Sequence, residues 1–74
     1  MIATINADQS TVLFIDPDGY SHFAPHGFCF ATFRINWQGE WELNYFHQTI
    51  ECAKQAFANL LADGWTVAIR TSAA

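Results

Sequence analysis

The feature that most limits how this chain can fold is the segment 28–46, FCFATFRINWQGEWELNYF, which has the pattern of a β-hairpin. Two runs rich in aromatic and β-branched residues flank the tetrapeptide Asn-Trp-Gln-Gly at residues 36–39. Asn is favoured at the first position of a type I turn and Gly at the fourth. A type I turn followed by a left-handed Gly makes a three-residue hairpin loop with a bulge. We therefore predict a turn at residues 36–39 in which Gly39 has a positive φ.

The register of this hairpin follows from the alternation of its side chains. A two-residue loop at Gln38 and Gly39 would pair Ile35 with Glu42, and each face would then mix apolar and charged residues. The three-residue loop instead pairs Ile35 with Trp41 and keeps one face apolar. Because a slip of one residue turns every side chain to the other face, a buried face selects the cleaner register. The predicted core face consists of Cys29, Ala31, Phe33, Ile35, Trp41, Leu43 and Tyr45.

The outer face of the hairpin is polar near the turn and apolar at its far end. Near the turn, Arg34 is expected opposite Glu42. At the far end the face carries three phenylalanines: Phe28, Phe30 and Phe46. An exposed apolar patch of this kind is unusual on a monomer, so the phenylalanines are either covered by another segment or form a contact surface. The segments expected to cover them are residues 2–6 or 11–15.

The remaining strands and turns are read from local composition. Strands are predicted at residues 2–6, at residues 11–15 and at residues 65–71, where β-branched and aromatic residues are frequent. The Asp-Pro-Asp-Gly sequence at residues 16–19 is a strong turn signal. A further short strand is expected within residues 20–27. The first two strands are expected to pair with each other as a hairpin.

A single helix is predicted from Ile50 to Asp63. Thr49 is its expected N-cap, and Gly64 is the expected left-handed residue after its last turn. We therefore predict one α+β domain over residues 1–74, with the order β-β-β-β-α-β and one helix packed on one face of a largely antiparallel sheet of four or five strands. The face expected to bind the helix is the core face of the hairpin. Eight residues are expected to be buried in this core: Phe33, Ile35, Trp41, Leu43, Phe57, Leu60, Val67 and Ile69.

The charge of the chain narrows the class of partner. Seven Asp and Glu residues stand against three Lys and Arg residues, which gives a net charge of −4. Phosphate contacts need clustered basic residues, whereas Arg34, Lys54 and Arg70 are separated in sequence. We therefore expect no nucleic acid as a partner. No run approaches the roughly 18 apolar residues of a membrane span, so we expect no membrane association and a cytoplasmic protein, in its own cell or in a host cell.

No motif in the sequence indicates catalysis or a cofactor. The chain has no nucleophile elbow and no Gly-rich phosphate loop, so it is expected not to be an enzyme. His22, His26 and Cys29 gather three residue types that bind zinc. Structural zinc sites combine two closely spaced pairs of ligands, and only the His pair has that spacing. We expect no bound metal, and a small zinc-binding domain is kept as an alternative.

A protein-binding surface is the function that remains. In size, acidity and sheet-plus-helix layout, the chain resembles the small inhibitors and accessory proteins encoded by phages and mobile elements, including anti-CRISPR proteins. This resemblance involves no motif and assigns no residue, but it implies a protein-binding module that inhibits a host protein complex. The alternative is a homo-oligomeric structural or regulatory protein, such as a homodimer. The expected binding residues are Phe28, Phe30, Trp37, Glu40, Glu42 and Phe46.

Overall fold

The computed structural model describes residues 11–72 and contains five strands and one helix within that range. The elements, in chain order, are β1 (Thr11–Ile15), β2 (Ser21–Pro25), β3 (Phe30–Ile35), β4 (Trp41–His47), α2 (Ile50–Ala62) and β5 (Val67–Thr71). The predicted α+β class and the order β-β-β-β-α-β are confirmed. The strand predicted at residues 2–6, and with it the predicted pairing of the first two strands, lies outside the described residues.

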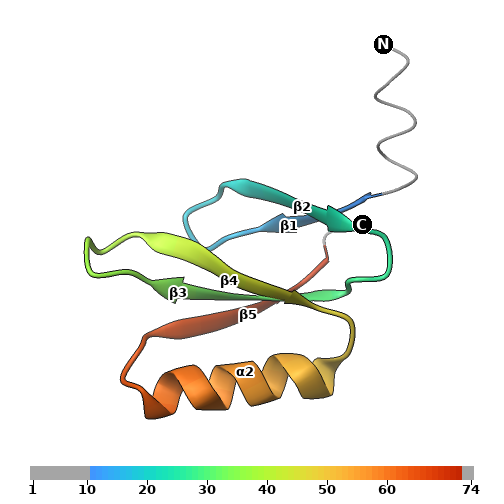
Figure 1. Cartoon of the computed structure of the whole chain (residues 1–74). Coiled ribbons are helices and arrows are strands. Elements are labelled where there is room, and N and C mark those ends of the chain that lie inside the picture. Colours follow the sequence, from blue (N-terminus) through green and yellow to red (C-terminus); the bar gives the residue numbers. More distant parts are fainter. Residues whose placement is uncertain (1–10, 73–74) are drawn as a thin grey trace.

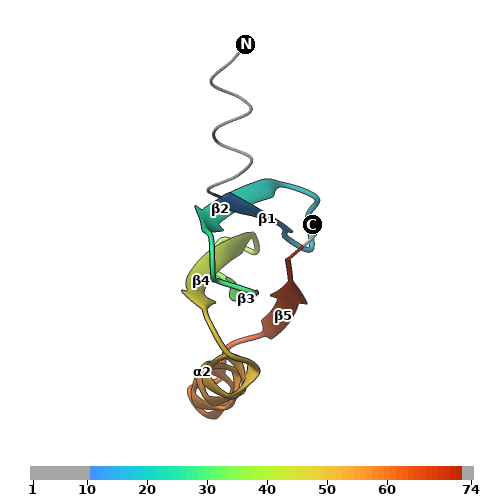
Figure 2. The same cartoon turned by 90° about the vertical axis from the view of Figure 1, so that its right-hand side faces the viewer.

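The five strands are divided between two sheets, rather than lying in one. β1 and β2 form a two-stranded antiparallel sheet, and β4, β3 and β5 form a three-stranded antiparallel sheet with β3 in its centre. Two perpendicular views place the β1–β2 hairpin on one face of the three-stranded sheet and α2 on the other (Figure 1, Figure 2). The molecule therefore has three layers, and both faces of the central sheet are covered.

The core lies between the β1–β2 hairpin and the central sheet. Four residues there are almost completely shielded from solvent: Phe14, Ala24, Ala31 and Phe33. Half-buried apolar side chains surround them: Val12, Phe28, Trp41, Leu43 and Phe46. Burying a phenylalanine side chain stabilises a fold by about 1.5–3 kcal/mol. The contact between the two sheets is therefore a substantial source of stability for so short a chain.

α2 packs on the opposite face of the central sheet from the one predicted. Side chains alternate along β3, so Phe33 faces the β1–β2 hairpin while Thr32 and Arg34 face the helix. Val67 is paired with Arg34 and Ile69 with Thr32, and paired residues project from the same face. β5 thus supplies the apolar side chains beneath the helix. The predicted packing of the aromatic face of the β3–β4 hairpin against the helix is wrong for this reason.

The extent of burial is also smaller than predicted. Among the eight residues predicted to be buried, Phe33 is fully buried, and the other seven are half-buried. Small domains bury a smaller share of their surface than large ones. Because the three layers are built from so short a chain, most core side chains remain partly exposed to solvent.

β4 contains a bulge that changes which residues face the core. The strands pair as predicted from the turn as far as Phe33 and Leu43, but the next pairing residue of β4 is Tyr45, so Asn44 is an extra residue. A bulge shifts the alternation of the strand beyond it. Tyr45 is consequently 68% exposed, and Phe46 packs on the core. The predicted core position of Tyr45 is wrong because of this inserted residue.

The helix begins and ends close to the predicted positions. The Thr49 hydroxyl accepts a hydrogen bond from the backbone N–H of Cys52 at 3.2 Å, which makes Thr49 the N-cap. The helix ends at Ala62, and Gly64 has a φ of 92°. Ala53 is its fully buried residue. Within residues 11–72, no helix has both the length and the apolar character that crossing a membrane requires.

Candidate binding site at the paired turns

The turn of the β1–β2 hairpin is held by the side chain of its first residue, Asp16. The backbone oxygen of Asp16 accepts a hydrogen bond from the N–H of Gly19 at 2.9 Å. The carboxylate Oδ1 of Asp16 accepts two more, from the N–H groups of Asp18 and Tyr20, each at 2.9 Å. Gly19 has a φ of 93°. These bonds define a type I turn closed by a left-handed Gly.

The turn of the β3–β4 hairpin repeats this arrangement with Asn36 in place of Asp16. The backbone oxygen of Asn36 accepts from the N–H of Gly39 at 2.9 Å. Its Oδ1 accepts from the N–H groups of Gln38 and Glu40 at 2.9 and 3.0 Å. Gly39 has a φ of 84°, which confirms the predicted turn. The two hairpins are therefore built on one turn geometry, and their first positions, 16 and 36, are twenty residues apart.

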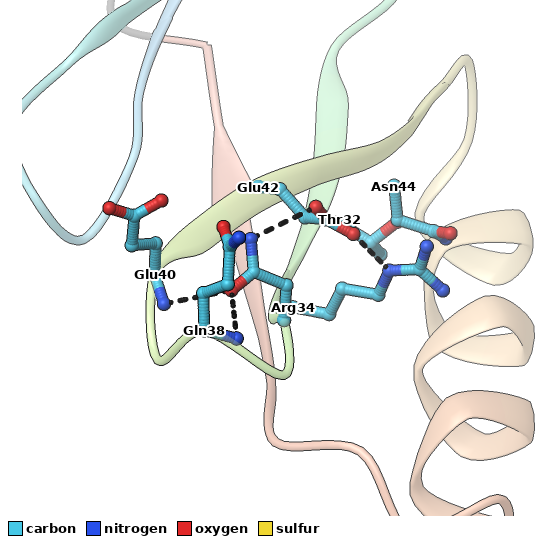
Figure 3. Close-up of polar contacts among 7 residues, drawn as sticks. Thr32, Arg34, Gln38, Glu40, Glu42 and Asn44 are labelled. Atoms are coloured by element: carbon cyan, nitrogen blue, oxygen red, sulfur yellow. Dashed lines mark hydrogen bonds and ion pairs between the residues drawn. The ribbon is translucent and has the colours of Figure 1, made fainter.

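The two turns lie at the same end of the molecule (Figure 1). An open hollow lies between them. This hollow has a volume of about 470 Å³ and is lined by Asp18, Tyr20, Glu40 and Trp41. The backbone N–H of Trp41 donates to Oδ2 of Asp18 at 3.4 Å, a long contact that connects the two turns. Figure 3 shows the Glu40 carboxylate pointing to the side on which the β1–β2 turn lies. We name this feature the paired-turn hollow.

The paired-turn hollow combines negative charge with aromatic surface. Asp18 and Glu40 are exposed carboxylates, Tyr20 is 71% exposed and Trp41 is half-buried. None of the lining residues is basic. Trp37, which follows the first position of the β3–β4 turn, is 89% exposed. Carboxylates and aromatic faces both attract cations, so the chemistry of the hollow favours a positively charged group.

The side chains of a second polar cluster, on the helix-facing side of the β3–β4 hairpin, form hydrogen bonds with one another (Figure 3). Nε of Arg34 donates to Glu42 Oε2 at 2.9 Å, which confirms the predicted pair, and Nδ2 of Asn36 donates to Glu42 Oε1 at 3.2 Å. The hydrogen bonds from Asn36 and Arg34 hold the pKa of Glu42 below its ordinary value. The Arg34 guanidinium also lies 4.3 Å from the centre of the Trp65 ring. Glu42, a predicted binding residue, is thus engaged within the protein.

The buried Thr32 anchors a third polar cluster at the bulge. Its hydroxyl accepts a hydrogen bond from Nδ2 of Asn44 at 3.0 Å and lies 3.0 Å from Nε2 of His47. It also donates to the backbone oxygen of Tyr45 at 3.4 Å. Burial lowers the pKa of His47 by disfavouring the charged ring. This cluster satisfies a buried hydroxyl and fixes the extra residue of β4.

Asp16 is a buried carboxylate paired with His22. The two side chains approach to 2.8 Å between Oδ2 and Nε2, and the His22 ring lies 5.1 Å from the ring of Phe33. Burial by itself raises the pKa of Asp16, but the hydrogen bonds from His22, Tyr20 and Asp18 outweigh it. The pKa of Asp16 therefore lies below its ordinary value. The Asp16–His22 pair thereby stabilises the β1–β2 turn.

The three residues considered as zinc ligands are not brought together. His22 is held by Asp16, and His26 and Cys29 are exposed. In the part of the chain that the structure describes, no group of three or more His, Cys, Asp or Glu side chains has an arrangement that could hold a metal ion. The predicted core position of Cys29 is wrong, because the pairing of β3 begins only at Phe30.

The three phenylalanines do not form an exposed patch. The ring of Phe46 lies 5.4 Å from that of Phe14 in β1, and Phe28 packs on the same core. Phe30 is half-buried. Phe14 belongs to the segment 11–15, so the contact between Phe14 and Phe46 agrees with the expectation that this segment covers part of the cluster.

Sequence reasoning selected one of the four residues that line the paired-turn hollow. Glu40 was a predicted binding residue, and the predicted Trp37 lies in the adjoining turn. Asp18, Tyr20 and Trp41 were missed, since nothing in the local pattern shows that two turns will end side by side. The available signal was the repeated Asx-x-x-Gly pattern at residues 16–19 and 36–39.

Comparisons of this chain with protein-family models, with curated proteins and with solved structures found no match. The paired-turn hollow is therefore interpreted from its own geometry and chemistry.

Proposed function

We propose that this protein is a small protein-binding module that contacts a basic surface of its partner through the paired-turn hollow. The observation that carries this proposal is the lining of the hollow, which combines two exposed carboxylates with two aromatic side chains: Asp18, Glu40, Tyr20 and Trp41. An aromatic anchor surrounded by polar groups is typical of the centre of a protein interface.

The two kinds of side chain have different roles in this proposal. Exposed carboxylates on a protein with a net charge of −4 speed the encounter with a basic partner. Tyr20 and Trp41 then provide contact area that excludes water from the contact. Because exposed charges are screened within about 8–10 Å at physiological ionic strength, association slows as salt is added.

In this proposal the protein acts by covering a surface of its partner, and it catalyses no reaction. In this proposal it resembles small inhibitors of larger protein complexes, including those that phages and mobile elements encode, and it works in the cytoplasm. The support for this setting is its small size, its acidity and the two cysteines, which are free thiols. None of the roles proposed for individual residues depends on this cellular setting.

A titration with a defined basic peptide tests the proposed site. Amide chemical shifts of labelled protein are followed while a peptide containing both Lys and Arg is added, and an acidic peptide of equal length serves as the control ligand. We expect shift changes concentrated at residues 16–20 and 36–41, weakening as salt rises. The Asp18→Asn/Glu40→Gln variant should lose most of the affinity.

A matched variant separates the site from the overall charge. Glu51→Gln/Asp63→Asn makes the same change in net charge at exposed positions in and just beyond α2. This control variant should bind the basic peptide like the wild type. Equal weakening in both variants would show a general charge effect, and the proposed site would be rejected. Absence of any binding by the wild type would reject the proposed function.

Self-association is a second candidate, and a different face favours it. Leu13 and Phe23 are paired on the outward face of the β1–β2 hairpin, next to Ile15. Ile15 and Phe23 are 38% and 63% exposed. Sedimentation velocity over a range of concentrations tests this candidate, with Phe23→Ser as the variant expected to remain monomeric. A wild type that is monomeric throughout would remove it.

A further inference from the structure

We infer that the paired-turn hollow receives the guanidinium group of an arginine side chain, in preference to the ammonium group of lysine. This inference rests on the proposed function, and it adds the chemical class of side chain that the hollow binds.

The guanidinium group matches both kinds of lining residue at once. It is planar, it stacks on aromatic faces, and its N–H donors point outward in its plane to carboxylates. Tyr20 and Trp41 offer aromatic surface, while Asp18 and Glu40 approach from separate turns. The lysine ammonium is a compact and strongly hydrated charge, so it gains less from contact with an aromatic wall.

The protein already holds one guanidinium group in this way. Arg34 lies 4.3 Å from the centre of the Trp65 ring and donates from Nε to the carboxylate of Glu42 at 2.9 Å. An indole and a carboxylate thus contact the guanidinium group of a residue that the backbone of β3 places beside them. The paired-turn hollow presents the same two groups, in Trp41 and Glu40, with no basic residue in its lining.

The carboxylates of the hollow have capacity for an incoming donor. Within residues 11–72, the Glu40 side chain takes part in no hydrogen bond or ion pair, and Asp18 accepts only the long contact from the Trp41 N–H. The Asp16 carboxylate, by contrast, already has three partners, His22 and two backbone N–H groups of its own turn. The volume of about 470 Å³ is within the range of roughly 300–1,000 Å³ found for ligand sites.

The test compares three short peptides that differ at one residue. The host sequence is an uncharged, blocked Gly-Ser-X-Ser-Gly, in which X is arginine, lysine or citrulline, the last being a neutral isostere of arginine. Binding is followed by the amide shifts of residues 16–20 and 36–41. We expect the arginine peptide to bind several-fold more tightly than the lysine peptide, and the citrulline peptide not to bind. The indole N–H signal of Trp65 should stay unchanged, since its partner Arg34 is already in place.

Variants identify which groups give the preference. Tyr20→Ser removes an exposed aromatic wall and leaves the core intact, so it should reduce the preference for arginine over lysine. Asp18→Asn/Glu40→Gln should weaken both charged peptides together. Equal affinity for arginine and lysine would overturn this inference and leave the proposed function in place. Failure of all three peptides to shift the paired turns would also overturn it, whereas the proposed function fails only if the longer basic peptide does not bind.

Discussion

Two kinds of residue in this protein depend closely on their surroundings: a half-buried histidine on β4 and the left-handed glycines of the turns. His47 is held near the fully buried Thr32 hydroxyl, where burial lowers the pKa of the ring. Gly39 has a φ of 84°, and apart from its two chain neighbours no residue has a heavy atom within 4 Å of the position that a Cβ would take. Each feature predicts a specific response to a change at that residue.

The lowered pKa of His47 predicts a loss of stability in mild acid. The folded state takes up this proton less readily than the unfolded state, so the contribution of His47 is complete above its unfolded pKa and is lost as the pH falls through its folded pKa. We expect the free energy of unfolding to decrease between about pH 7 and pH 5. Urea unfolding at several pH values measures this. In His47→Gln the decrease should be smaller, and an unchanged slope would contradict the role of His47.

Replacing Gly39 by valine should destabilise the protein by about 1–3 kcal/mol, because a β-branched residue is strained in the left-handed region. The open space around Gly39 means that the cost comes from the backbone and not from a clash. Gly39→Asn is the matched control, since Asn tolerates this region best among the larger residues. Chemical denaturation of both variants gives the comparison. Equal stability of the valine and asparagine variants would contradict this explanation.

At the scale of elements, the sequence predicted what local chemistry determines and missed what depends on distant contacts. The Asn36 turn, the Arg34–Glu42 pair and the capped ends of α2 all follow from neighbouring residues, and all are observed. The bulge at Asn44 was missed, because its stabilising partner, Thr32, is on another strand. The face to which α2 binds was missed because it depends on β5, whose apolar side chains complete that face. The hollow was missed for the same reason, since its lining comes from two separate hairpins.

The shared geometry of the two turns predicts that replacing Asp16 by Asn keeps the turn but removes the anionic partner of His22. In Asp16→Asn the side-chain oxygen can still accept from the turn, as that of Asn36 does, but the anionic partner of His22 is lost. Because the pKa of Asp16 is lowered in the folded state, its contribution is present above its unfolded pKa and is lost as the pH falls through its folded pKa. Stability below about pH 4 should therefore depend less on pH in the variant. Thermal unfolding in acid tests this, and an unchanged acid dependence would contradict it.

At the scale of the whole molecule, stability depends on the attachment of the β1–β2 hairpin to the central sheet. Phe14 is fully buried between these layers, whereas Phe57 in α2 is only half-buried. The apolar contact that joins the three layers is thus concentrated on the side away from the helix.

Phe14→Ala should cost about 3–5 kcal/mol, enough to unfold a domain of this size. Phe57→Ala should cost less, since less of its ring is removed from solvent. Urea unfolding of the two variants, monitored by circular dichroism, gives the two values. A larger loss for Phe57→Ala would show that the helix layer, and not the hairpin layer, dominates stability.

Because the paired-turn hollow lies between two layers, ligand binding in the hollow is thermodynamically linked to the docking of these layers. One wall belongs to the β1–β2 turn and the other to the β3–β4 turn, so the hollow exists only while the two hairpins are docked. A ligand that binds only the docked form adds its binding free energy to the cohesion of the layers. Occupancy of the hollow would therefore raise the temperature at which the β1–β2 hairpin separates from the central sheet. Conversely, a core substitution that weakens the docking of this hairpin would weaken ligand binding, although the substituted residue does not contact the ligand.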